Sequence, residues 1–281
     1  MVSNCTLAAQ SAGIRVGYAS GETRNCAFEN LTIDSNCGLK VKVRGSGSVQ
    51  GVIFSKIIMR TRLITGHWRG KGEPVNVSCL PLRTSGELGH IRRIRFSNIL
   101  PESENSALVF GSPDRPIEDV MFDKFDLRLT NSQLQPSYGG NFDLRGAADL
   151  AMALFKHDVP ALYVRRVRRL RVAGFRETWG GEKPAFFSHA IVAEDFQDVE
   201  IRQFEGRQAN AADVAAIALR RGNGISILDC RAAEGCGTFL SQAGVSGQGL
   251  FVNNGLSISK RAIEPFRHGF RDLGNLLLKR S

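Results

Sequence analysis

The sequence has few of the residues that mark several common classes of protein. Among 281 residues there are only three Tyr, two Trp and nine Pro, and the six cysteines form no Cys-x-x-Cys pair. No cysteine has a histidine at ligand spacing, so we expect no structural zinc or other metal site. The longest mostly apolar run, residues 147–155, is interrupted by Asp149 and is about half a membrane span. These absences argue against a zinc-stabilised domain and against a helical membrane protein.

Positive charge is in excess along the chain. Lys and Arg number 37 against 27 Asp and Glu, which gives a formal net charge of +10. Such a balance favours a polyanionic partner, namely nucleic acid, an anionic polysaccharide or a membrane surface. The first ten residues, MVSNCTLAAQ, have neither the basic region nor the apolar segment of a signal peptide.

A short phrase recurs along the chain, in which a polar turn precedes an apolar–polar alternation around Phe and then an aliphatic pair. It reads CAFENLTI at 26–33, VIFSKII at 52–58, IRFSNIL at 94–100 and VMFDKFDL at 120–127, with weaker copies at 170–175, 199–204 and 225–230. The central residues, separated by 26, 42, 26, 50, 29 and 26 positions, are Phe28, Phe54, Phe96, Phe122, Val172, Ile201 and Ile227. The two long gaps indicate either one unit with an insertion or nearly two units.

Repeated units of about 26 residues with two or three short strands predict an all-β fold, a single-stranded right-handed parallel β-helix. The segments have period two and are bounded by Gly, Asn, Asp or Ser. We expect the β-helix to span residues 1–265, with the four Phe residues stacked as an internal ladder. Helical spacing is found only at 143–155 and after Ile263, so residues 266–281 are expected to form a tail or short helical cap.

The residue two positions after each Phe is expected at a turn. Asn30 and Asn98 occupy this position in two of the phrases, where an amide can bond the equivalent group one coil away. Lys56 and Lys124 occupy it in the other two, so any amide ladder is interrupted.

The succession of SAGIRVG (11–17), RNCAFENLTI (24–33), NCGLKVK (36–42) and SVQGVIFSKIIM (48–59) resembles the polygalacturonase-like family, glycoside hydrolase family 28. TGHWRGKGEP (65–74) looks like a segment of its bacterial members, and the resemblance extends over about residues 4–265. It implies a pectin lyase-type β-helix that hydrolyses an acidic, pectin-type polysaccharide with inversion and without a cofactor. It also implies a secreted or periplasmic location.

The family's catalytic aspartates have no counterpart in this chain. Lys40-Val41-Lys42 stands where the family has Arg-Ile-Lys, but Ser11-Ala12-Gly13 stands where it has Gly-His-Gly. The Asp-Asp pair would fall before Met1, so catalytic residues are left unassigned. Either the first coils are missing and an upstream extension would carry the pair, or the chain is a shortened relative without hydrolase chemistry. Three further carboxylates, Asp34, Glu102 and Glu104, are expected near the face that carries Lys40 and Lys42. The simpler interpretation is that they are exposed acids in turns.

A row of cations is the first candidate for substrate binding. Alternation points Lys40 and Lys42 outward, and Arg15, 25 residues earlier, should lie one coil below Lys40. Such a row suits the carboxylates of uronates, because Arg offers a two-pronged contact and Lys a point charge. The alternative is an ordinary solvated face of a basic protein.

A glycine-rich insertion supplies the second group of candidates. Trp68 could stack on a sugar, Arg69 could contact a carboxylate, and His67 or Glu73 could transfer a proton. The alternative is a loop that packs back on the β-helix through Trp68.

Two further functions stay open. One is a non-catalytic carbohydrate-binding or structural module, and the other is a polysaccharide lyase with Lys42 or Arg44 as base and a need for calcium. Six arginines within 164–176 could contact phosphates, but no nucleic-acid motif or interleaved aromatic strip accompanies them. We therefore expect an acidic polysaccharide or oligosaccharide as partner, and neither nucleic acid nor a membrane.

Overall fold

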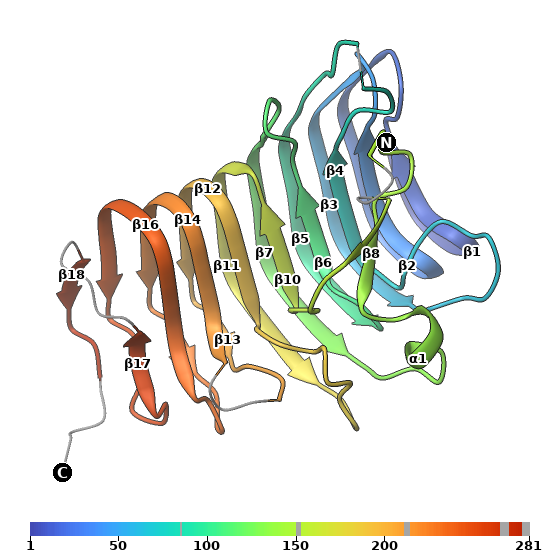
Figure 1. Cartoon of the computed structure of the whole chain (residues 1–281). Coiled ribbons are helices and arrows are strands. Elements are labelled where there is room, and N and C mark those ends of the chain that lie inside the picture. Colours follow the sequence, from blue (N-terminus) through green and yellow to red (C-terminus); the bar gives the residue numbers. More distant parts are fainter. Residues whose placement is uncertain (85, 150–152, 211–213, 265–269, 277–281) are drawn as a thin grey trace.

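The computed structural model describes the chain except for residues 85, 150–152, 211–213, 265–269 and 277–281 (Figure 1). The described residues form β-strands and one short helix, α1 (Gln135–Tyr138). The long strands are β1 (Val2–Val16), β2 (Glu22–Val43), β3 (Ser48–Thr61), β5 (Ile91–Ser103), β7 (Ile117–Leu129), β11 (Val167–Trp179), β12 (Ile191–Arg202), β14 (Ala215–Leu228) and β16 (Thr238–Val252). The short strands are β4 (Val75–Cys79), β6 (Ala107–Phe110), β8 (Asn141–Asp143), β9 (Leu154–Lys156), β10 (Leu162–Arg165), β13 (Glu205–Gly206), β15 (Arg231–Ala232), β17 (Arg261–Glu264) and β18 (Phe270–Leu273).

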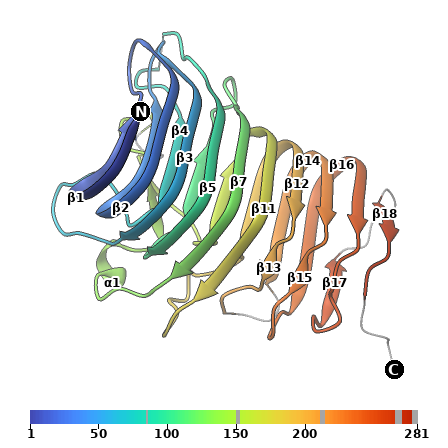
Figure 2. The same cartoon turned by 180° about the vertical axis from the view of Figure 1, so that it is seen from behind.

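Sixteen of these strands belong to one large sheet, whose pairings are parallel. The long strands follow one another in chain order from β1 to β16, so the chain advances by one strand per repeat (Figure 2). The short strands β4, β6 and β10 form a second row that continues from the end of β2. This all-β arrangement of stacked parallel strands is consistent with a parallel β-helix.

The predicted phenylalanine ladder is confirmed. Phe28, Phe54, Phe96 and Phe122 occupy equivalent register positions on β2, β3, β5 and β7. Their rings are stacked, with centroids 5.1, 5.3 and 4.9 Å apart along the series. The column continues with Val172, the central residue of a weaker repeat. Identical inward positions therefore stack on one another, which explains why the phrase recurs with the same residue type.

The predicted turn position is a sharp corner in each coil. Asn30, Lys56, Asn98 and Lys124 all have positive φ, between 52° and 55°. Only glycine, and to a lesser degree Asn and Asp, adopts this left-handed conformation readily. The side-chain amide of Asn30 donates to Oδ1 of Asn4 one coil away at 2.6 Å, as expected for an amide rung.

The two long gaps each contain an insertion rather than a further coil, since β3 pairs directly with β5 and β7 with β11. The first insertion includes the β3–β4 loop (62–74). The second includes α1 and the β8–β9 hairpin (141–156), in which Asn141 pairs with Lys156 in antiparallel register. The hairpin packs Phe142 and Leu144 on the outer face of the short-strand row, where they form a second apolar core.

Neither of the two segments with helical spacing forms a helix within the described residues, so the expected helical cap is not seen there. In the first segment Asp143 pairs with Leu154 in the antiparallel β8–β9 hairpin, and Leu144 and Phe155 pack on the second core. In the tail, β17 and β18 pair with β16 and continue the sheet, since β16 offers a free backbone edge. Residues 265–269 and 277–281 of the predicted cap lie outside the described part.

Many surface charges are paired from one coil to the next. Arg169 contacts Glu118 at 3.1 Å, Arg165 contacts Asp195 at 3.0 Å, and a third pair of this kind joins β11 to β13. Arginines of the 164–176 run thus neutralise acids of neighbouring coils, and the net positive charge overstates the free charge on this flank. All six cysteines are free thiols.

Candidate functional site

The predicted row of cations exists at the start of the short-strand row. Arg15 is in register with Lys40, and Lys40 is in register with Asn76 on the next coil. Both Lys40 and Lys42 point away from the internal core, yet each is only 2% exposed. The β3–β4 loop and the β8–β9 hairpin cover them, so their ammonium groups do not face an open groove.

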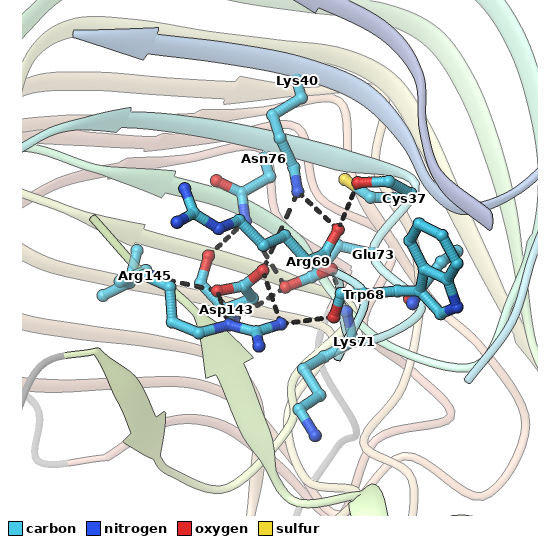
Figure 3. Close-up of polar contacts among 12 residues, drawn as sticks. Cys37, Lys40, Trp68, Arg69, Lys71, Glu73, Asn76, Asp143 and Arg145 are labelled. Atoms are coloured by element: carbon cyan, nitrogen blue, oxygen red, sulfur yellow. Dashed lines mark hydrogen bonds and ion pairs between the residues drawn. The ribbon is translucent and has the colours of Figure 1, made fainter. Parts of the chain in front are cut away.

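The ammonium group of Lys40 lies between the two insertions (Figure 3). It donates a hydrogen bond to the backbone carbonyl of Arg69 at 3.1 Å, in the β3–β4 loop. It also lies 3.9 Å from Oδ2 of Asp143, at the end of β8. The carboxylate of Asp143 is fully buried, so Lys40 supplies part of the charge that allows it to stay ionised.

Arg145 completes the charge balance of Asp143. Its guanidinium donates to Oδ1 at 2.9 Å and to Oδ2 at 3.3 Å, and it also reaches the carbonyl of Trp68. Burial raises the pKa of the Asp143 carboxyl, but the hydrogen bond from Arg145 and the charges of Lys42 and Lys40 outweigh it. The net result is a pKa below the usual value, and Asp143 is a charged anchor for the covering segments.

Glu73 is a fully buried acceptor rather than an exposed acid. Its carboxylate receives the backbone N–H of Lys71 at 2.7 Å and that of Asp143 at 2.9 Å. The side-chain amide of Asn76 donates to it at 3.4 Å. With its oxygens engaged in this way, Glu73 holds the loop and the hairpin together and has no exposed oxygen for proton transfer to a sugar.

Lys42 and Arg44 extend the buried charges beneath the hairpin. Burial lowers the pKa of Lys42 to about 7, and the charges of Lys40 and Arg44 act in the same direction. Burial also lowers the pKa of Arg44, to about 10. Its guanidinium donates to the carbonyl of Ser78 at 2.8 Å and to that of Leu144 at 3.4 Å. Arg44 therefore ties the sheet to the hairpin.

The other four predicted residues are exposed and lie together at the edge of this cluster. The guanidinium of Arg15 lies over the Tyr18 ring, 5.6 Å from its centroid, and Arg69 donates to the Tyr18 hydroxyl at 3.4 Å. Trp68 is 47% exposed, and its ring points away from the buried contacts (Figure 3). We call Arg15, Tyr18, His67, Trp68 and Arg69 the Tyr18 patch. The β3–β4 loop thus packs back through Glu73 and the Arg69 carbonyl, while Trp68 stays outside.

The three acids considered at the sequence level have other partners. Asp34 pairs with Arg62 at 3.0 Å, and Glu102 lies 3.7 Å from Arg128. A carboxylate oxygen of Glu104 accepts the backbone N–H of Leu63 at 2.7 Å. Asp34 and Glu102 therefore take part in ion pairs with arginines, and Glu104 anchors the start of the β3–β4 loop.

Sequence reasoning missed the residues that come from the second insertion, above all Asp143 and Arg145. The insertion carries no copy of the repeat phrase, so nothing in its spacing places it over Lys40. Tyr18 was missed for a simpler reason, because a single Tyr after a strand carries no signal. A search of the described residues finds no cluster of three His, Cys, Asp or Glu side chains that could hold a metal ion.

Among the residues that the structure describes, no helix has the length and apolar character needed to cross a bilayer. Comparisons with protein-family models, with curated proteins and with solved structures found no match.

Proposed function

We propose that this chain is a right-handed parallel β-helix of the glycoside hydrolase family 28 kind that holds an acidic, pectin-type polysaccharide. In this proposal the chain supplies the substrate-binding part of the groove, and the protein acts in the periplasm or outside the cell, where such polymers occur. The observation that carries the proposal is the Tyr18 patch, in which Arg15 and Arg69 flank one aromatic ring beside the exposed Trp68.

The chemistry of the patch suits a uronate. Arginine binds a carboxylate through two parallel N–H donors, which gives direction as well as charge. An exposed aromatic face such as that of Trp68 can pack on the C–H face of a sugar ring. Arg15 and Arg69 are already oriented by Tyr18, so less side-chain freedom is lost when the ligand binds.

A non-catalytic binding module is the second candidate, and one observation favours it. Lys40 and Lys42, which stand where the family has its basic motif, are covered by the β3–β4 loop and the β8–β9 hairpin. A polymer on the Tyr18 patch would therefore contact Arg15 and the loop rather than these lysines. The lyase alternative meets the same obstacle, because Lys42 and Arg44 are buried too.

Equilibrium binding of polygalacturonate to the full chain tests the proposal. We expect the Arg15→Ala/Arg69→Ala variant to bind at least about tenfold more weakly, since two charge-assisted contacts are lost. Trp68→Ala should weaken binding without changing its dependence on salt, because it removes no charge. Undiminished binding by both variants would rule out the patch as the binding site.

A matched control is Arg83→Ala/Lys260→Ala, which also removes two exposed cations but lies outside the patch. It should bind like the wild type, because net charge alone does not create a site. Incubation with the polymer then separates the candidates. New reducing ends indicate hydrolysis, absorbance from an unsaturated uronide indicates a lyase, and binding without either product indicates the module.

A further inference from the structure

A groove runs across the coils along the corner formed by Asn30, Lys56, Asn98, Lys124 and Gly174, which we call the lysine corner. These five residues occupy equivalent positions, and each has positive φ. The groove has a volume of about 740 Å³ and shares no residue with the Tyr18 patch. It is an open depression on the outer surface, made by one turn of each successive coil.

The charges that line this groove fall into two groups. At one end Arg176 contacts Glu205 at 2.9 Å, and Asp126 is in register with Arg176 on the neighbouring strand. These three form a ladder of alternating sign. Lys56 and Lys124 lie on the corner itself and are exposed, with Lys124 two residues before Asp126 on β7. Among the described residues neither ammonium lies within 4.0 Å of an acid.

Three of the four arginines with positive φ at other corners lie within 4.0 Å of an acid, and among the described residues Arg93 does not. Arg169 lies 3.1 Å from Glu118, and Arg221 lies 2.7 Å from Asp195. Those cations take part in the coil-to-coil pairing that stabilises the fold. Pairing with an acid therefore does not explain the two lysines of the lysine corner.

The backbone does not explain them either. Asn suits a left-handed corner because its side chain can hydrogen-bond locally, and Asn30 forms such a rung with Asn4. Lysine has no comparable bond to offer, so Lys56 and Lys124 stand in a conformation that favours other residues. Residues held in unfavourable conformations are found preferentially where they serve a ligand.

Two exposed apolar side chains lie beside the row of lysines, two residues after Lys56 and Asn98 on their strands. Ile58 is 59% exposed and Leu100 is 51% exposed, and both line the groove. Lys56 and Lys124 are two rungs apart, roughly 10 Å at the strand spacing of a parallel sheet. The groove thus presents two cations with the amide of Asn98 between them. An apolar strip of Ile58 and Leu100 runs beside this row and is followed on β7 by Asp126.

We infer that the lysine corner is a second subsite for the acidic polysaccharide, an inference that rests on the proposed function. Carboxylates of one short stretch of polymer pair with Lys56 and Lys124. The C–H faces of its rings lie on Ile58 and Leu100, and Asn98 hydrogen-bonds a hydroxyl. A polymer that occupies both the patch and the corner gains affinity through linkage of the two sites.

Calorimetric titration of the full chain with a short polygalacturonate oligomer tests the inference. The informative variant is Lys56→Asn/Lys124→Asn, which removes both cations and supplies the residue that the corner prefers. We expect it to lose one of two binding events while its melting temperature stays equal or rises. Arg93→Asn is the matched control, because it changes an exposed cation with positive φ at another corner.

The outcomes distinguish the two proposals. If Arg15→Ala/Arg69→Ala alone abolishes all binding, the lysine corner is not a subsite and the proposed function stands. If binding remains in that variant and disappears only after the lysine substitutions are added, the inference is supported. Residual binding that is insensitive to Lys56→Asn/Lys124→Asn would overturn it. A wild-type chain that binds no oligomer would overturn both proposals.

Discussion

Glu73 accepts a hydrogen bond from the backbone N–H of Asp143 at 2.9 Å, although 70 residues separate them in the sequence. The bond joins the β3–β4 loop to the β8–β9 hairpin above the outer face of the sheet. Both side chains are fully buried. Glu73 accepts hydrogen bonds from the loop and from the hairpin, and Asp143 accepts them from Arg145 and forms an ion pair with Lys40 of β2. The two insertions therefore form one layer that the β-helix alone would not hold in place.

Glu73→Gln should destabilise this layer. A glutamine offers one acceptor oxygen and turns an N–H toward the donors of Lys71, Asn76 or Asp143. We expect the free energy of unfolding to fall by roughly 1–3 kcal/mol, the cost of a buried unsatisfied donor. The urea midpoint measures it, with the exposed Glu234→Gln as control. Equal midpoints for the two variants would contradict the role of Glu73.

Lys40→Met should also be destabilising, because Asp143 then keeps its burial but loses one of its positive partners. We expect a loss of about 3 kcal/mol, the lower end for a broken buried pair, since Arg145 still contacts the carboxylate. Chemical denaturation measures the loss. Lys56→Met is the surface control and should stay within about 0.5 kcal/mol of the wild type.

Lys42 predicts a specific dependence of stability on pH. Its pKa is about 7 in the folded protein, against 10.5 for an exposed lysine. Between these values the unfolded chain binds a proton that the folded chain does not, so this group makes stability rise with pH. The contribution is roughly 1.4 kcal/mol per pH unit.

Lys42→Met removes that contribution. We therefore expect the variant to be more stable than the wild type below pH 7, with a gain that shrinks as the pH approaches 10.5. Urea unfolding of both proteins at about pH 6, 8 and 10 gives the difference directly. A gain that is the same at all three values would show that Lys42 is charged in the folded protein.

Phe96→Ala tests the internal ladder. The Phe96 ring is fully buried, with ring centroids of Phe54 and Phe122 at 5.3 and 4.9 Å. Its removal should cost about 3–5 kcal/mol from lost burial and the cavity left behind. Phe96→Leu retains much of the volume and should cost clearly less. Thermal or urea unfolding that ranks the two variants in the opposite order would argue against the stack.

The sequence made the stacked coils predictable because each coil repeats the same inward residue. Phe28, Phe54, Phe96 and Phe122 are similar because they meet one another, so periodicity reveals the contact. It also revealed the register of Arg15 with Lys40, since one repeat length separates them.

The cover over Lys40 could not be predicted in the same way. Glu73, Asp143 and Arg145 meet across insertions that have no repeat, and a contact between two irregular segments leaves no periodic signal. The expected helical cap at the C-terminus was not found for a different reason. Apolar residues after Ile263 have helical spacing, but the open edge of β16 provides backbone partners that outweigh this local preference.

The layer formed by the two insertions also changes the order in which the coils should unfold. Coils of a solenoid contact only their neighbours and can in principle detach one after another from an end. Here Arg44 reaches the carbonyl of Leu144, 100 residues away, and Asn105 reaches that of Asn141. Backbone amides from β2 to β10 should therefore exchange with solvent as one cooperative unit. The described residues place no such strap over β14 and β16, whose amides should exchange earlier and coil by coil.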